Sequence, residues 1–225
     1  LAWEEANVAA AAKAGKNHFV GEFGSNQCVG ATRQTDIDLY ERGVLMARLV
    51  VNFLNAGAVG TSYWSLIDQY YGRNEPYAAM QQLGMWRYMR IAYRQDPDPN
   101  VYDRLTSDYQ PRPQYYAYSL LTRFVRKGSE VYPLDLGSEF AAGTAIRTAD
   151  DRWTYVIANA TGQDLSFDLK NTLRGGMSDC KVYTYEERRL PDGDEQIAPS
   201  LQLENLDGTF CVGVRAHSVI VLTQL

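Results

Sequence analysis

One carboxylate stands within an apolar segment near the start of the chain. Glu22 follows residues 18–21 (HFVG) and is followed by Phe23 and Gly24. Burying an ionised carboxylate costs free energy unless the group is paired or used in chemistry. Two interpretations of Glu22 are therefore open. It is a catalytic carboxylate at the end of a buried strand, or a structural carboxylate held by loop amides or by an arginine such as Arg33.

A second segment places an aromatic side chain beside polar groups. Residues 59–67 (VGTSYWSLI) form an apolar run in which the tryptophan stands near the end, and polar and aromatic residues follow. The face of an indole ring is an apolar platform for the C–H groups of a sugar, while its N–H can find a polar partner. The alternative for this tryptophan is an ordinary core position. We predict four substrate-binding residues here: Trp64, Asp68, Gln69 and Tyr70.

Other catalytic arrangements find little support in the sequence. The two histidines, His18 and His217, lie in separate halves of the chain, which argues against a histidine metal cluster. Neither a Gly-x-Ser-x-Gly motif nor a phosphate-binding glycine loop is present, so we predict no metal and no cofactor. The three cysteines, Cys28, Cys180 and Cys211, are too few for a disulfide scaffold. A disulfide between the last two is weighed against buried free thiols, and free thiols are favoured.

The composition is that of an ordinary globular protein. The chain has 225 residues, of which 45% are hydrophobic and 22% charged, and its formal net charge is −5. No window approaches the ~18 uncharged apolar residues of a membrane span, so we expect none. An acidic chain without a basic run also argues against nucleic acid as a partner.

The first half of the chain alternates helical and strand-like patterns. Apolar residues recur at helical spacing in three segments, which are separated by two short apolar runs. Parallel strands joined by a helical crossover explain this order most simply, and they bring Glu22 and Trp64 to one edge of a sheet. In an α/β barrel that edge holds the catalytic groups. The predicted elements are helix 3–16, strand 18–24, helix 37–55, strand 59–67, a long polar and aromatic loop, and helix 114–126.

From about residue 129 the apolar pattern changes to alternation. Residues 1–128 hold 14 basic and 12 acidic residues, a net charge of +2, whereas residues 129–225 hold 8 and 15, a net charge of −7. Short alternating segments with turn residues between them predict an antiparallel β-sandwich, so we place a domain boundary here. The predicted strands are 131–134, 141–148, 153–159, 165–169, 181–185, 200–203, 209–214 and 218–223.

The order of these segments resembles a known enzyme family. Residues 18–25 (HFVGEFGS), a long helix and residues 60–68 (GTSYWSLID) are similar to strands seven and eight of retaining glycoside hydrolases of clan A. The Gly-Glu-Phe-Gly sequence resembles that of the cellulase-like family five. Residues 113–121 (PQYYAYSLL) resemble the last helix of such barrels, and residues 216–222 (AHSVIVL) resemble the final strand of their appended β-sandwich.

The resemblance implies a fold and a reaction. Residues 1–128 would be the C-terminal part of a (β/α)8 TIM barrel, and residues 129–225 a β-sandwich accessory domain. The reaction would be retaining hydrolysis of β-glycosidic bonds in a poly- or oligosaccharide. Glu22 would be the nucleophile, and Trp64 would floor the subsite of the cleaved sugar. The resemblance also implies a secreted or periplasmic location.

One part of the family pattern is missing. Clan A enzymes carry the general acid/base in an Asn-Glu pair at the end of strand four, and no such pair precedes Glu22. We therefore expect a longer enzyme, in which this chain meets a carbohydrate substrate and an N-terminal barrel segment, and we expect the 225 residues alone to be inactive. The alternatives are a non-catalytic carbohydrate-binding protein of the same fold, and a structural module in which Glu22 is held by its neighbours.

Overall fold

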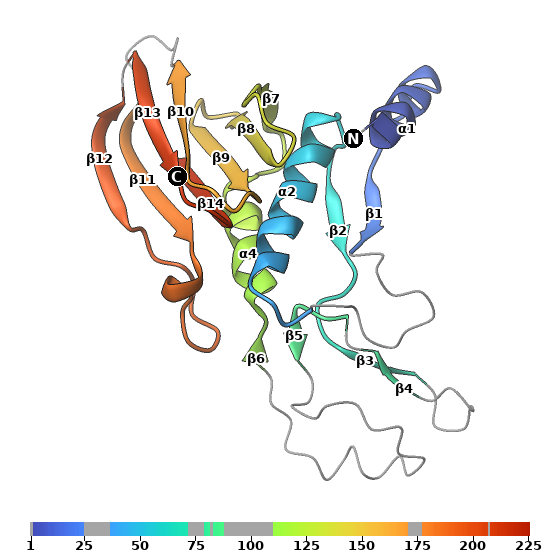
Figure 1. Ribbon diagram of the computed structural model, residues 1–225. Helices are drawn as coiled ribbons and strands as arrows, with labels where there is room; N and C mark the ends of the chain where they lie inside the picture. The colour runs from blue at the N-terminus through green and yellow to red at the C-terminus, as the bar shows by residue number, and fades with distance from the viewer. Residues whose placement is uncertain are drawn as a thin grey trace.

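The structure is a computed structural model that describes residues 2–24, 37–71, 79–81, 83–87, 110–170, 177–206 and 208–225. Among the described residues, the α-helices lie in the first half of the chain together with six short strands, and eight further strands follow in the second half (Figure 1). The fold is thus mixed α/β, with more strands than helices among the described residues. No helix among them is long and apolar enough to cross a membrane. Cys28 lies outside this part of the chain.

The first half contains the predicted alternation. Strand β1 (Val20–Phe23) pairs in parallel with β2 (Thr61–Tyr63), and helix α2 (Glu41–Asn55) connects them. The predicted parallel pairing is therefore confirmed. Helix α1 (Ala2–Lys13) precedes β1, and helix α4 (Pro113–Phe124) follows later, with proline in its first turn.

Helix α2 begins four residues later than the sequence predicts. Residues 37–40 form turns, and Tyr40 is the N-cap residue without a side-chain cap bond. Its hydroxyl instead donates to the carbonyl oxygens of Tyr185 at 3.0 Å and of His217 at 2.6 Å. The side chain before the helix is thus bound to the second half of the chain, a contact that local propensity could not indicate.

Between β2 and α4 the structure contains short strands where the sequence predicts a loop. Strand β3 (Gln69–Tyr71) pairs antiparallel with β4 (Ala79–Gln81), and β5 (Trp86–Arg87) pairs antiparallel with β6 (Gln110–Pro111). These strands have two or three residues each, too short for a recognisable alternation.

The second half contains all eight predicted strands, with ends shifted by a few residues at most of them. Six of them form an antiparallel sheet in the order β12-β11-β14-β9-β8-β7, and β10 pairs with β13. A short 3-10 helix, Glu187–Arg189, follows β11. The strands are β7 (Glu130–Leu134), β8 (Ala141–Arg147), β9 (Trp153–Asn159), β10 (Leu165–Lys170), β11 (Met177–Tyr185), β12 (Leu201–Leu206), β13 (Thr209–Val214) and β14 (Ser218–Thr223).

Alternation along the central strands builds two cores. In β9, Val156 and Ala158 join the cluster that contains α2 and α4, whereas Tyr155 and Ile157 join the cluster that contains β10 and β13. Because successive side chains of a strand point to opposite faces, the helices cover one face of the large sheet and the β10–β13 pair covers the other. The first cluster draws side chains from both sides of Gly128, so the two halves of the chain share a core.

Cys180 and Cys211 form no disulfide with each other. Cys180 is a buried free thiol on β11, and burial raises its pKa to about 11. Cys211 is also free, as favoured, but it is exposed on β13 and contacts the hydroxyl of Ser166 at 2.9 Å. The prediction of burial was therefore wrong for Cys211, because its position in β13 faces away from the core that Val212 enters.

Candidate active site at the β1–β2 edge

The two parallel strands turn one face toward the helices. Phe23 is paired with Tyr63, and their rings meet edge to face with centroids 5.5 Å apart. Phe23 is 8% exposed and also contacts the rings of Phe53 from α2 and Tyr118 from α4. This aromatic contact fixes which face of the β1–β2 pair is covered.

The register of β1 against β2 is irregular between Val20 and Phe23, so strict alternation does not place the side chains in between. The side chains next to Phe23 and Tyr63 are those of Glu22, Ser62 and Trp64. All three are exposed, and the Trp64 side chain retains 39% of its accessible area. The backbone N–H of Trp64 donates to the carbonyl of Phe23 at 2.9 Å, so the two strand ends are joined. Glu22 and Trp64 are thus both exposed near the carboxyl ends of neighbouring parallel strands.

The segment after Trp64 is held by a second chain segment. The Trp64–Ser65 peptide bond is cis. The carbonyl of Ser65 accepts from the N–H of Met85 at 2.9 Å, and the carbonyl of Leu66 accepts from the N–H of Trp86 at 2.9 Å. The tryptophan therefore lies between β1 on one side and this backbone ladder on the other.

Asp68 differs from Trp64 in its surroundings. Its side chain is buried, and both carboxylate oxygens accept from Arg112, at 2.7 and 2.9 Å. Burial by itself would lower the pKa of Arg112, but the hydrogen bonds and charges of Asp68 and then of Asp38 raise it above its usual value. The contacts seen for Asp68 are structural ones, and a contact with substrate stays a prediction.

The other two predicted substrate-binding residues lie further along. Gln69 and Tyr70 belong to β3, and only the course of their backbone is described. Their role therefore remains a prediction from the sequence.

Sequence reasoning missed two residues at this edge. Ser62 is exposed one residue before Tyr63, and the alternation within residues 61–64 could have indicated it. Arg112 is 2% exposed and pairs with a residue 44 positions away, a separation that carries no local signal.

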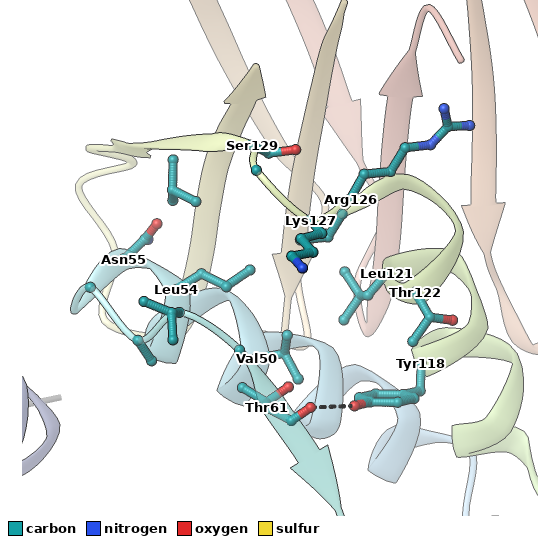
Figure 2. A pocket seen from close by; sticks show the side chains of 17 residues that line it. Val50, Leu54, Asn55, Thr61, Tyr118, Leu121, Thr122, Arg126, Lys127 and Ser129 are labelled. Carbon is teal, nitrogen blue, oxygen red and sulfur yellow. Dashed lines mark hydrogen bonds between the residues drawn. The ribbon is translucent and has the colours of Figure 1, made fainter. Parts of the chain in front are cut away.

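A cavity of about 660 Å³ lies at the other end of the strands (Figure 2). It is lined by the C-terminal halves of α2 and α4, by the start of β2 and by residues 125–129. Leu54 and Leu121 contribute apolar walls, and the hydroxyl of Tyr118 donates to the carbonyl of Thr61 beside it. Strand β2 leads from this cavity to Trp64, so the cavity and the Glu22 face are separate features.

Comparison with known proteins identifies the fold. No protein-family model matches the sequence, and no curated protein matches it. A family 30 endoxylanase structure from Clostridium papyrosolvens C71 is similar, with a TM-score of 0.57, 15% identity, and coverage of 94% of this chain and 42% of that one. A family 30 subfamily 8 xylanase from Clostridium acetobutylicum gives a TM-score of 0.63 and 12% identity over 96% of this chain and 44% of that one. An endo-β1,6-glucanase gives a TM-score of 0.56 and 14% identity over 98% of this chain and 38% of that one.

At these identities the likeness concerns the fold. The chain folds like part of a clan A glycoside hydrolase, as the sequence resemblance implied. It spans about two fifths of the length of the structures that it matches. Since the xylanases belong to family 30, the likeness to the cellulase-like family five stays a prediction.

Proposed function

We propose that this chain supplies the nucleophile half of the active site of a retaining glycoside hydrolase. The observation that carries the proposal is that Glu22 and Trp64 are both exposed near the carboxyl ends of two paired parallel strands. In barrels built from such strands, catalytic groups come from this end. The exposure of Glu22 supports a carboxylate that meets a ligand, in preference to one held by its neighbours.

The two side chains would divide the reaction between them. Glu22 would attack the anomeric carbon and form a glycosyl-enzyme that water later hydrolyses. Trp64 would lie against the apolar face of the sugar ring and fix its orientation. A second carboxylate, about 5–5.5 Å from Glu22, would protonate the leaving oxygen and later deprotonate the water. The mechanism needs no metal and no organic cofactor.

The proposal extends to the fold of the complete enzyme. We assign β1 and β2 to strands seven and eight of a (β/α)8 barrel, with α2 and α4 as outer helices. Residues 129–225 would then form the β-sandwich domain, the large sheet facing the β10–β13 pair. Each of β1 and β2 pairs with one strand among the described residues, so the barrel strands that close the sheet would come from the rest of the protein. The second carboxylate would come with them.

The substrate class follows from the same comparison. The similar structures carry the names of xylanases and of a β1,6-glucanase. We propose a β-linked poly- or oligosaccharide as the substrate of this protein.

Trapping the covalent intermediate tests the assignment. A 2-fluoro aryl β-xyloside or β-glucoside forms a glycosyl-enzyme that hydrolyses slowly, so the protein containing the complete barrel should gain one sugar mass on the peptide with Glu22. Glu5, an exposed carboxylate on α1, offers a matched control: Glu5→Gln should be labelled and Glu22→Gln should not. A label on a different carboxylate would overturn the assignment. Sugar binding without label or turnover would favour the non-catalytic alternative.

A further inference from the structure

Arg112 occupies an unusual position for a cation. It is 2% exposed and stands immediately before α4 in extended backbone, at φ −83° and ψ 160°. The following proline favours that conformation and sets the start of the helix. The guanidinium is thereby fixed at the base of α4 and directed into the protein.

The guanidinium joins three segments that are distant in sequence. Nη1 and Nη2 donate to the two carboxylate oxygens of Asp68 at 2.7 and 2.9 Å, the geometry of a bidentate pair. Nη1 also donates to the carbonyl of Gly84 at 2.7 Å, and Nε donates to Asp38 at 2.7 Å. The segment before α2, the segment after β2 and the segment before β5 therefore meet at one side chain.

Gly84 makes this meeting sterically feasible. A Cβ atom at this position would overlap the backbone of Ile67 and Asp68. With glycine there, the N–H of residue 84 donates to Asp68 at 2.9 Å while its carbonyl accepts from Arg112. The two backbones thus approach closely, as a glycine allows.

The contacts of Arg112 with Asp68 and Gly84 lie at the far end of the segment that begins with Trp64. At the near end, the backbone N–H of Trp64 is bonded to Phe23 of β1. At the far end, the N–H of Asp68 donates to the carbonyl of Trp86 at 3.2 Å, and Arg112 holds the Asp68 carboxylate. The exposed indole is consequently carried on a short span that is fixed at both ends.

We propose that Arg112, acting through Asp68 and Gly84, is a positioning residue that keeps the Trp64 indole in place beside Glu22. The role as a sugar platform rests on the proposed function, whereas the restraint on the indole does not. Lysine would retain the charge but offers a point charge in place of a planar fork, so it could not hold both oxygens of Asp68 together with Gly84.

Fluorescence of a single tryptophan tests the restraint without any sugar. Replacing Trp3, Trp86 and Trp153, together with any tryptophan in the rest of the protein, by phenylalanine leaves Trp64 as the only reporter. In this background Arg112→Lys should lower the anisotropy of Trp64 and raise its acrylamide quenching constant, with the far-ultraviolet circular dichroism unchanged.

A matched control comes from the same helix. Arg123 donates to the carbonyl of Ile197 at 3.0 Å and lies over the rings of Phe124 and Tyr183, away from Trp64. Arg123→Lys should lower the melting temperature without changing the Trp64 signals. The proposal is overturned if Arg112→Lys lowers the melting temperature and leaves anisotropy and quenching as they were.

A milder variant keeps the test valid should Arg112→Lys not fold. The Asp38 side chain is 40% exposed and accepts from Nε of Arg112, whereas Asp68 accepts from Nη1 and Nη2. Asp38→Asn should therefore shift the Trp64 signals in the same direction by less. Unchanged signals in that variant would overturn the proposal. Failure of the glycosidase assignment would appear separately, as the absence of label on Glu22.

Discussion

The two sheets that border α2 and α4 differ in what covers them. The six-stranded sheet has helices on one face and the β10–β13 pair on the other, and all six residues of β14 are buried. Among the described residues, the β1–β2 pair packs against the helices through Phe23 and Tyr63, whereas Glu22 and Trp64 are exposed.

Because of this difference, we expect the large sheet to contribute to stability and the exposed residues of the β1–β2 pair to contribute to function. A sheet covered on both faces derives its stability from apolar burial within the chain. A sheet covered on one face leaves polar and aromatic groups accessible, and such groups can bind a ligand or a further segment of protein. Substitutions in the large sheet should therefore change the free energy of unfolding, whereas substitutions on the open face should change activity.

The largest effect is expected at Glu22. In the protein with the complete barrel, Glu22→Gln removes the attacking charge at almost constant shape, so turnover of an aryl β-glycoside should fall by several orders of magnitude. Because the side chain is exposed, the melting temperature should stay close to that of the wild type. Retention of more than a small fraction of wild-type turnover would contradict the assignment.

The complementary effect is expected in the large sheet. Ile157 on β9 is 0% exposed, so Ile157→Ala should reduce the free energy of unfolding by about 2–5 kcal/mol in chemical denaturation. Leu201 on β12 of the same sheet is 54% exposed, and Leu201→Ala should cost about 0.5 kcal/mol or less. Equal losses in the two variants would mean that the large sheet is not packed on both faces.

Trp64 should affect binding more than stability. Its side chain is 39% exposed, and Trp64→Ala removes the platform while leaving most of the core contacts intact. Loss of an aromatic contact worth about 1 kcal/mol corresponds to a five- to tenfold weaker affinity for an oligosaccharide, measured by titration calorimetry of the protein with the complete barrel. The neighbouring Leu66, 66% exposed, provides Leu66→Ala as a control. A drop in melting temperature without a change in affinity would show that Trp64 is a core residue and not a substrate contact.

Local patterns predicted much of the fold. The bounds of β9, β13 and β14 agree with those predicted from alternation and turn residues. Glu22 and Trp64 are candidate site residues because an unusual residue stands in each of two short apolar runs, and their roles stay predictions.

What the sequence could not indicate depends on distant contacts. The order of strands in the large sheet places β14 between β11 and β9, which no local pattern specifies. The pairing of Asp68 with Arg112 spans 44 residues and carries no local signal. The place of Asp68 near Trp64 in the sequence predicts a substrate contact, and that contact stays a prediction. The predicted start of α2 lies four residues before the observed one. Tyr40, just before the helix, is hydrogen-bonded to Tyr185 across 145 residues, a contact with no local signal.

The smallest effect is expected where the helices meet the large sheet. The hydroxyl of Tyr185 donates to the carbonyl of Tyr40 at 2.7 Å, and the hydroxyl of Tyr40 donates to the carbonyl of Tyr185 at 3.0 Å. The two rings are stacked with centroids 4.6 Å apart. Burial raises the pKa of Tyr185, so its hydroxyl stays protonated and remains a donor over the working range of pH. Tyr185→Phe keeps the stacking and removes one hydrogen bond. The carbonyl of Tyr40 still accepts from the N–H of Gly43 at 2.9 Å, so the loss should be about 1 kcal/mol, near the net value of one bond.

Tyr132 provides the matched control for this last prediction. It is 41% exposed on β7, and its hydroxyl donates to Glu130 at 2.6 Å in contact with solvent. Water can replace that bond, so Tyr132→Phe should change the free energy of unfolding by no more than about 0.5 kcal/mol. Urea denaturation of both variants, followed by circular dichroism, measures the difference. If the two losses are equal, the reciprocal tyrosine pair adds nothing to the junction beyond its ring contact, and the helices are held on the large sheet by apolar packing alone.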